Sequence, residues 1–503
     1  MGFLSTLSKP IAAYIARQTN QWKCRPEETQ AKVFSMLIQQ AKNTAFGRAH
    51  DFSGIKSYDD FKTRVPVKDY EGLKPYFERV KNGEADVLWR GRPLYLSKTS
   101  GTTSGIKYIP ITRESIPNHI RSTRNALLSY IHETGKPAFL DGKLIFISGS
   151  PALEQINGIP VGRLSGIVNH HVPAYLRRQQ MPTFKTNCIE DWELKVDKIV
   201  EETMHENMTF ISGIPPWVQM YFDKLTERTG KPIIDLFPNF NLFVYGGVNY
   251  EPYRKKLEQS IGKKVDSIEL YPASEGFLAY QDSQEDSSLL LMLNSGIFFE
   301  FIPASEFFAE HPTRVSLSGV QTGINYVIIL NTNAGLWGYC LGDTVKFVST
   351  NPYKIIVTGR ISQFISAFGE HVIAEEVEKA LRDALLEQHA EVVEFTVAPQ
   401  VNPDAGELPY HEWFIEFHRA PEDLEKFRIR IDESLQKQNI YYQDLMNGNI
   451  LQPLKIRLLK KDAFIDYMRS KGKLGGQNKV PRLSNDRNFV EGLDTNNATP
   501  LQP

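Results

Sequence analysis

The stretch Ser97–Thr112, SKTSGTTSGIKYIPIT, gathers hydroxyl side chains and two glycines ahead of Lys107 and an apolar run. Glycines let backbone N–H groups approach an anion, hydroxyls add hydrogen-bond donors, and a lysine adds positive charge. The combination is typical of a phosphate-binding loop. The same residue types also form ordinary surface turns between strands, and the stretch does not fit the G-x-x-x-x-G-K-[ST] pattern. Both interpretations stay open at this point.

Two further segments place small or polar residues at the end of a predicted strand. The segment VYGGVN contains Gly246 and Gly247, whose exposed backbone can lie against a flat ring or simply form a turn. The segment LYPASEG ends a strand with Tyr271, Ser274 and Glu275. Because ligands bind at the carboxyl edge of a parallel sheet, these side chains are candidate ligand contacts.

Acidic residues are candidates for metal and sugar contacts. Mg²⁺ favours one or two carboxylates together with phosphate oxygens, so Glu275 beside a phosphate loop is a candidate Mg²⁺ ligand. Asp343 follows Gly342 in a predicted tight turn, and Arg360 comes later in the chain. An aspartate that accepts hydrogen bonds from ribose hydroxyls, with an arginine nearby, would complete a nucleotide site. Each residue also has a plain interpretation as a turn residue or a solvated surface charge.

The elements that would position these residues alternate between helix and strand as far as Tyr326. Helical spacing of apolar residues predicts helices over 28–45, 113–134 and 190–207, and Pro215 and Pro216 mark another helix start. Buried-strand patterns, such as Lys143–Ser148, lie between the helices, which predicts a mostly parallel α/β sheet. Beyond Tyr326, short strands with turns predict an antiparallel part, followed by a strand–strand–helix–strand–helix series to about Lys471.

Length and composition indicate a soluble globular protein of two or more domains, because 503 residues exceed what one core usually serves. Hydrophobic residues make up 41% and charged residues 23%, and the net charge is -1, which argues against nucleic-acid binding through bulk electrostatics. The three cysteines are far apart, which suggests neither a disulfide framework nor a zinc site. No apolar run reaches transmembrane length, and the N-terminal stretch predicts an amphipathic helix.

The motifs together resemble those of the adenylate-forming superfamily, which includes acyl-CoA ligases and firefly luciferase. The segment TSGTTSGIK resembles its phosphate loop, with Ser104 in place of a glycine and Ile106 in place of a proline. The segments YGGV, YPASE and LGD follow in the superfamily's order, and Gly359–Leu381 resembles its Gly-Arg hinge segment. Two departures lie there: Ser362 stands where Lys or Asp usually forms the hinge, and Ser366 stands where Lys is usual.

A narrower family, the Gretchen Hagen acyl-acid amido synthetases of the auxin-responsive group and their bacterial relatives, is more similar. The segment before the loop, SYDDFKTRVPVKDYEGLKPYFERVKNGE, resembles this family, and so does the terminal block that ends in GGQNKVPRL. The similarity runs from about residue 25 to 485. The terminal block is the most specific signal, because CoA ligases normally end in a Pro-x-x-x-x-Gly-Lys pattern.

The resemblance implies a role for each candidate residue. It makes Lys479 and Lys107 catalytic and Ser362 the hinge, and it places the β- and γ-phosphates against Ser100, Gly101, Thr102, Thr103 and Ser104. It assigns the adenine and ribose to Gly246, Gly247, Tyr271, Ser274, Asp343 and Arg360, and Mg²⁺ to Glu275. Arg121 and Arg124 on the helix after the loop, and His170 in VNHHVPAYL, are candidate contacts of the acyl acid; solvated surface and a hydrogen-bonded loop histidine are the alternatives.

The resemblance also implies an architecture and a reaction. We expect a large N-terminal domain, 1–359, with mostly parallel sheets and a β-barrel-like part, a small mobile α+β domain, 360–485, and a flexible tail, 486–503. The expected enzyme uses ATP and Mg²⁺ to adenylate a carboxylic acid and joins it to an amine, an amino acid in this family. It is expected to be a cytoplasmic monomer that binds neither nucleic acid nor a membrane. An acyl-CoA ligase and a non-catalytic binding protein are the alternatives.

Overall fold

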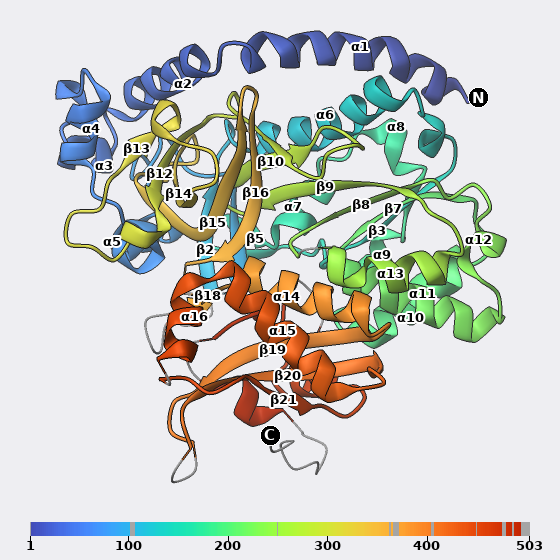
Figure 1. Ribbon diagram of the computed structural model, residues 1–503. Coiled ribbons are helices and arrows are strands. Elements are labelled where there is room, and N and C mark those ends of the chain that lie inside the picture. Colours follow the sequence, from blue (N-terminus) through green and yellow to red (C-terminus); the bar gives the residue numbers. More distant parts are fainter. Residues whose placement is uncertain are drawn as a thin grey trace. The chain divides into compact units, whose positions relative to one another are not determined.

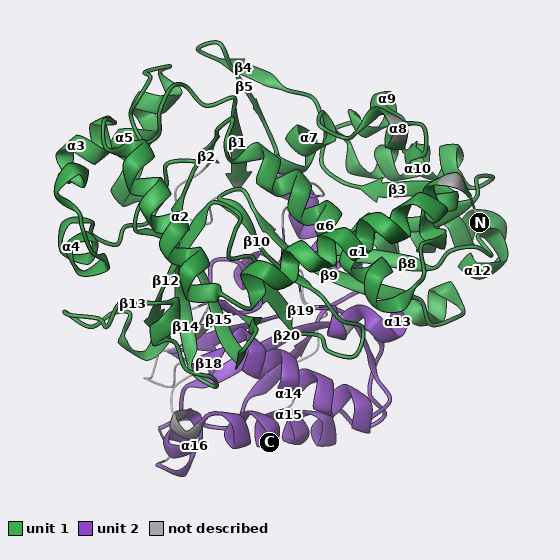
Figure 2. Ribbon diagram, turned by 90° about the horizontal axis from the view of Figure 1, so that it is seen from above, with its two compact units in different colours: residues 1–249, 257–357 green, residues 250–256, 358–503 purple. Residues whose placement is uncertain are grey.

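The computed structural model of the chain divides into two compact units, residues 1–249 with 257–357, and residues 250–256 with 358–503 (Figure 2). The structure describes residues 2–100, 106–248, 250–361, 364–365, 372–403, 407–448, 450–474, 479–484 and 487–493. The division at 357/358 falls close to the boundary expected after residue 359. The short segment 250–256, expected in the N-terminal domain, groups with the second unit.

The first unit is built on a 12-stranded mixed sheet (Figure 1). The strands β6, β3, β7, β8 and β9 run parallel, and the rest of the sheet is antiparallel wherever pairing is described. In spatial order the strands are β13 (Val315–Ser316), β12 (Ile297–Pro303), β14 (Asn325–Thr332), β15 (Tyr339–Thr350), β16 (Tyr353–Arg360), β11 (Leu289–Leu291), β10 (Gly276–Gln281), β9 (Asp266–Ala273), β8 (Leu242–Gly246), β7 (Met208–Gly213), β3 (Lys143–Ile147) and β6 (Gln180–Met181).

This arrangement confirms the predicted α/β class, with a parallel half followed by an antiparallel half. The antiparallel strands expected to form a barrel-like part continue the large sheet instead, and the described strands are not closed into a ring. The parallel half brings the carboxyl ends of β3, β7, β8 and β9 to one edge, where ligands bind in open α/β sheets.

Helices cover this sheet on both sides. In Figure 1, α1 and α6 lie on one side of the parallel strands, with α10 and α11 on the other. Pro215 occupies the first turn of α11, as predicted, because proline needs no hydrogen-bonded N–H there. The helices are α1 (Phe3–Lys23), α2 (Pro26–Ala41), α3 (Ala45–Ala49), α4 (Tyr58–Arg64), α5 (Tyr70–Lys81), α6 (Ile116–Thr134), α7 (Leu164–Asn169), α8 (Ala174–Arg177), α9 (Phe184–Asn187), α10 (Trp192–Thr203), α11 (Pro215–Thr229) and α12 (Ile233–Leu236). Helix α13 (Glu251–Ile261) begins in the segment 250–256 that groups with the second unit.

A second, smaller sheet in this unit carries the opening motif. It has four strands in the order β2 (Ile106–Ile111), β1 (Tyr95–Ser100), β5 (Ile159–Gly162) and β4 (Glu154–Ile156). Strands β1 and β2 pair antiparallel with Ser100 opposite Ile106, so they flank the segment 101–105 as a hairpin. None of the described helices of the chain is both long and apolar enough to cross a lipid bilayer.

The second unit follows the predicted strand and helix series. Its three-stranded sheet has β20 (Tyr410–Arg419) between β19 (Glu391–Gln400) and β21 (Lys455–Leu458), and the short strands β17 (Phe364–Ile365) and β18 (Val372–Ile373) pair separately. The helices α14 (Ala374–Glu387) and α15 (Leu424–Gln438) share a buried core with this sheet that includes Val377, Trp413 and Ile431. The remaining helices are α16 (Ile440–Asn447) and α17 (Ala463–Ser470).

The segment expected to be a flexible tail, 486–503, is described in its first part. Residues 487–493 are described, and Val490 and Leu493 are buried against Phe464 and its neighbours. Apolar side chains at this spacing cover an apolar patch, which a polar reading of the whole tail overlooked. Residues 494–503 lie outside the described part of the chain.

Candidate nucleotide-binding site

Lys107 lies at the start of β2, next to the segment predicted to bind phosphate. Its Nζ is 5.6 Å from the centre of the Tyr70 ring, a cation–π distance. The Tyr70 hydroxyl accepts a hydrogen bond from the backbone N–H of Tyr108 at 3.0 Å, which ties α5 to β2. Burial raises the pKa of Tyr70, so this hydroxyl stays neutral beside the ammonium.

The loop itself is only partly described. Ser100 is the last residue of β1, and its side chain is not described. Gly101, Thr102, Thr103 and Ser104 lie outside the described residues, so their phosphate-binding roles remain predictions.

A buried hydroxyl pair joins β1 to the end of β9. The Ser97 and Ser274 Oγ atoms lie 2.9 Å apart, although the residues are 177 positions apart in the chain, and Ser97 is 0% exposed. Ser97 also lies opposite Gly162 in the β1–β5 pairing. The pair thus fixes the hairpin that flanks the predicted phosphate loop against the strand end that carries Ser274. The sequence analysis quoted Ser97 in the opening motif but gave it no role.

Glu275, the predicted Mg²⁺ ligand, follows Ser274 and is 8% exposed. Its Oε1 accepts a hydrogen bond from the Tyr339 hydroxyl at 3.2 Å, which orients the carboxylate from β15. Among the described residues, no group of three or more His, Cys, Asp and Glu side chains could hold a metal ion. A single oriented carboxylate fits Mg²⁺ that takes its other ligands from phosphate oxygens and water.

The predicted adenine and ribose residues also meet. The Tyr271 hydroxyl donates a hydrogen bond of 2.7 Å to Oδ2 of Asp343, which joins β9 to β15. This contact orients the carboxylate, and a carboxylate can accept several hydrogen bonds, as a ribose contact requires.

The two glycines at the end of β8 are required for different structural reasons. At Gly246 a Cβ atom would lie 2.3 Å from the carbonyl oxygen of Leu270, so only glycine fits beside β9. Gly247 has φ of 84°, a left-handed conformation that favours glycine. Both features leave bare backbone next to Tyr271 in the neighbouring strand, as a flat ring requires.

We name the first-unit residues that these contacts bring together the strand-end cluster. It comprises Ser97, Tyr271, Ser274, Glu275, Tyr339 and Asp343. Ser97 and Tyr339 were missed by the sequence analysis, because their roles depend on partners far away in the chain.

Arg360 and Lys479 belong to the second unit, and Ser362 and Ser366 lie outside the described residues. Lys479 is exposed, at the start of the described segment 479–484. That segment is anchored to β19, because Val397 N–H donates to the Arg482 carbonyl and Ser484 N–H donates to the Val397 carbonyl, both at 3.0 Å. The buried Arg482 guanidinium also pairs with Glu378 at 3.2 Å and with Glu394. The roles of Arg360, Ser362 and Lys479 remain predictions.

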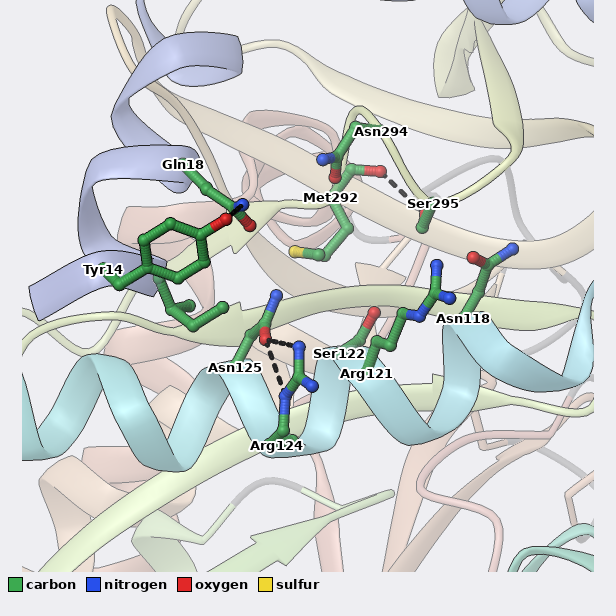
Figure 3. Close-up of a pocket in the computed structure, with 11 residues that line it drawn as sticks. Tyr14, Gln18, Asn118, Arg121, Ser122, Arg124, Asn125, Met292, Asn294 and Ser295 are labelled. Atoms are coloured by element: carbon green, nitrogen blue, oxygen red, sulfur yellow. Dashed lines mark hydrogen bonds between the residues drawn. The ribbon is translucent and has the colours of Figure 1, made fainter. Parts of the chain in front are cut away.

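The three candidate contacts of the acyl acid do not join the strand-end cluster. His170 Nε2 lies 2.8 Å from the Pro151 carbonyl oxygen, which fits the alternative of a hydrogen-bonded loop histidine. Arg121 and Arg124 are exposed on α6 and line a pocket whose lining contains no residue of the cluster (Figure 3). The one-turn spacing was correctly seen, but the sequence does not show which neighbour this face of α6 meets.

A buried cation at the carboxyl end of β3 was also missed. Lys195 on α10 is 2% exposed, and its Nζ donates to the carbonyl oxygens of Ser148 at 2.8 Å and Asn187 at 2.7 Å. Burial lowers the pKa of the Lys195 ammonium to about 8, and burial also lowers the pKa of nearby Arg163. The available signal was a lysine on the apolar face of the predicted helix, between Trp192 and Val196.

Three models of one family match the chain. They are the GH3 family N-terminal domain over residues 15–187, the GH3 family central domain over residues 290–360, and the GH3 family C-terminal domain over residues 375–488.

Similar proteins extend over nearly the whole chain. The indole-3-acetic acid-amido synthetase GH3.3 of Arabidopsis thaliana is 24% identical over 93% of this chain and 91% of its own, and the jasmonoyl–L-amino acid synthetase JAR4 of Nicotiana attenuata is 23% identical over 92% and 91%. The solved structure of the AtGH3.15 acyl acid amido synthetase in complex with 2,4-DB has a TM-score of 0.77 at 19% identity, over 96% of this chain and 95% of that chain. The structural likeness confirms the fold. Since the three models match the N-terminal, central and C-terminal parts in order, this chain belongs to the GH3 family.

Proposed function

We propose that this protein is an AMP-forming ligase that uses ATP to adenylate a carboxylic acid and then transfers the acyl group to the amino group of an amino acid. The observation that carries the proposal is the strand-end cluster, where side chains of three nucleotide motifs are joined in pairs by hydrogen bonds. Membership of the GH3 family supports the same reaction, because the relatives described above are amido synthetases.

The chemistry explains why a nucleotide is needed. A carboxylate does not form an amide directly, because oxide is a poor leaving group. When a carboxylate oxygen attacks the α-phosphorus of ATP, the bond to the β-phosphate oxygen breaks, and acyl-adenylate and pyrophosphate form. The amine nitrogen then attacks the acyl carbon, loses a proton, and expels AMP.

In this proposal the chain's residues bind and orient ATP. Lys107 holds the β- and γ-phosphates together with the loop from Ser100, the glycines after β8 and Tyr271 frame the adenine, and Asp343 accepts from the ribose. Glu275 would hold Mg²⁺, which would offset negative charge on the phosphates. Lys479 stabilises charge on the α-phosphate, and Arg360 assists at the ribose.

Pyrophosphate exchange tests the first half-reaction. Enzyme, ATP, Mg²⁺ and labelled pyrophosphate are incubated with each member of a carboxylic-acid panel, and at least one acid should return label to ATP. Chelation of Mg²⁺ with EDTA should stop the exchange, and added Mg²⁺ should restore it. A panel with no active acid would favour a non-catalytic binding protein on the same fold.

The acceptor separates an amide ligase from a thioester ligase. One active acid is offered CoA and a mixture of amino acids together, and the products are identified by mass spectrometry. We expect acyl-amino acid as the main product. A dominant acyl-CoA peak would overturn the proposal in favour of an acyl-CoA ligase.

The role of Lys479 is tested by separating the half-reactions. Lys479→Ala should slow adenylation by about 10²–10³-fold, the scale for losing one preorganised donor. Amide formation from supplied acyl-adenylate should fall much less, and an equal loss in both steps would remove the assigned role.

We also propose that the protein works as a monomer in the cytoplasm, without nucleic acid or a membrane. The near-neutral net charge of -1 supports the lack of a nucleic-acid partner. Size-exclusion chromatography with light scattering should give the mass of one chain, and a dimer mass would contradict this part of the proposal.

A further inference from the structure

A polar pocket lies in the first unit, and no residue of the strand-end cluster lines it. It has a volume of about 370 Å³, within the range of small-ligand sites. Its walls come from α1, α6 and the segment after β11 (Figure 3). It is lined by Tyr14, Ile15, Gln18, Asn118, Arg121, Ser122, Arg124, Asn125, Met292, Asn294 and Ser295.

The pocket carries two positive charges, and no carboxylate of a described residue pairs with either. Arg121 and Arg124 line it, and none of the lining residues is acidic. Arg124 donates to the neutral amide oxygen of Asn125 at 3.0 Å and 3.3 Å, and within the described part of the chain Arg121 has no hydrogen-bond or ion-pair partner. Elsewhere in this unit, exposed arginines such as Arg79 pair with a carboxylate. The charge of the pocket is therefore available to an anion.

Other hydrogen-bond donors lie around the two guanidinium groups. Gln18 Nε2 donates to the Tyr14 hydroxyl oxygen at 2.6 Å, so the Tyr14 O–H can donate in turn. Figure 3 shows Arg121 and Arg124 rising from α6, with Tyr14 and Gln18 on α1 at one side and Asn294 and Ser295 across from them. A ligand here would meet donors from three chain segments.

The surroundings of the pocket add positive charge. Helix α1 contains Lys9, Arg17 and Lys23 and no acidic residue. Only Lys23 of these three is in a described ion pair, with Asp282 at 2.8 Å. None of the three lines the pocket itself, so they add only a long-range positive field, which salt screens over about 10 Å.

We propose that this pocket binds the phosphate group of a small soluble molecule. Two guanidinium groups one helical turn apart match a doubly charged tetrahedral oxyanion better than a singly charged carboxylate, because each guanidinium can present two parallel N–H donors to phosphate oxygens. The buried side chains of Met292 and Ile15 offer an apolar surface to the rest of the ligand. The site is independent of the proposed catalytic reaction.

Binding of inorganic phosphate to the full chain tests the proposal, with glycerol 3-phosphate as a second probe. Both are titrated by calorimetry into the wild type and into an Arg121→Gln, Arg124→Gln double variant. The double variant should bind each probe at least about tenfold more weakly, since hydrogen bonds to charged groups contribute more than neutral ones. Both arginines are exposed, so the variant should fold, which circular dichroism checks.

Three controls separate this site from other sources of binding. Arg178→Gln removes an exposed arginine away from the pocket and should bind like the wild type. In a protein that already carries Lys107→Ala, adding the two arginine substitutions should weaken phosphate binding by the same factor as in the wild type. This control separates the pocket from the predicted phosphate loop. Vesicles of phosphatidylcholine with and without phosphatidic acid test a lipid source in a sedimentation assay.

Equal phosphate affinity of wild type and double variant would overturn the proposal. Arginine-dependent binding to phosphatidic acid vesicles without binding of either soluble probe would also overturn it, because the ligand would then be a lipid surface.

Discussion

The carboxyl ends of two strands in the same sheet, β9 and β3, carry opposite charges. At the end of β9, Glu275 and the Tyr271–Asp343 pair place carboxylates next to tyrosine hydroxyls. At the end of β3, the ammonium of Lys195 donates to two backbone carbonyl oxygens. The Lys195 ammonium is held by neutral carbonyl dipoles, which orient a charge without cancelling it as an ion pair would. This edge of the sheet thus has an acidic end, at Glu275 and Asp343, that suits a metal ion and a ribose. It also has a basic end, at Lys195, with no assigned role.

Along this edge of the sheet, the largest expected effect is at Glu275. Glu275→Gln keeps the size of the side chain and an oxygen for the Tyr339 hydroxyl, but it removes the charge that would hold Mg²⁺. Adenylation should fall on the order of 10²-fold, as when one preorganised charge-stabilising group is lost. Pyrophosphate exchange measured over a range of Mg²⁺ concentrations should also show a higher half-saturating concentration.

Tyr339→Phe is the matched control for Glu275. It keeps the carboxylate and removes only the hydrogen bond that orients it, so the loss should stay within about 10–100-fold, as for other groups behind a metal ligand. If Glu275→Gln had the same half-saturating Mg²⁺ concentration as the wild type, the assignment of the metal site to the acidic end would be wrong.

Asp343 should determine preference for ribose over deoxyribose. A site built around a ribose hydroxyl leaves its carboxylate unpaired when 2′-deoxy-ATP binds, which costs about 1–3 kcal/mol. The wild type should therefore prefer ATP by roughly 10–100-fold in kcat/KM for exchange, and Asp343→Ala should use both nucleotides alike. Tyr271→Phe removes only the hydrogen bond that orients the carboxylate, so its preference for ATP should lie between those of the wild type and Asp343→Ala. Equal use of both nucleotides by the wild type would contradict the assignment.

The basic end predicts a pH-dependent stability. Below pH 8 Lys195 is protonated in both the folded and the unfolded chain, so the cost of burying its ammonium is fully present. Between pH 8 and the unfolded value of 10.5 the unfolded chain binds more protons, and the free energy of unfolding rises with pH by up to about 1.4 kcal/mol per pH unit. A neutral amine still has two N–H groups for the Ser148 and Asn187 carbonyls.

Urea unfolding checks this prediction. Lys195→Met lacks the titrating group, so the difference in unfolding free energy between wild type and variant should shift in favour of the wild type by about 1.5 kcal/mol from pH 8 to 9.5. Titration of other groups affects both proteins and cancels in the difference. A constant difference over this range would show that the folded-state pKa of Lys195 is close to its ordinary value.

Local patterns predicted much of this molecule and missed its long-range contacts. The helix at Pro215 and the strand ends at Gly246 and Ser274 follow from turn residues and apolar spacing, which act over a few residues. Their long-range partners cannot be predicted in this way, because Tyr339, for example, contacts Glu275 only once distant strands have paired. Lys195 breaks the apolar pattern of its helix, which marks a buried charge but does not reveal its acceptors.

The pair Ser97–Ser274 carries the smallest expected effect and tests whether the acidic end is held together across the two sheets. Replacing one serine by alanine leaves the other buried hydroxyl unpaired, so each single variant should lose about 1–2 kcal/mol of stability, and the double variant should lose about 1 kcal/mol less than their sum. The exposed pair Ser316–Ser318, with Oγ atoms 3.2 Å apart, is the matched control and should show a coupling energy near zero. If the pair also fixes the phosphate-loop hairpin against β9, both single variants should raise the KM for ATP in pyrophosphate exchange. Additive single variants with unchanged KM would mean that β1 and β9 are positioned by other contacts.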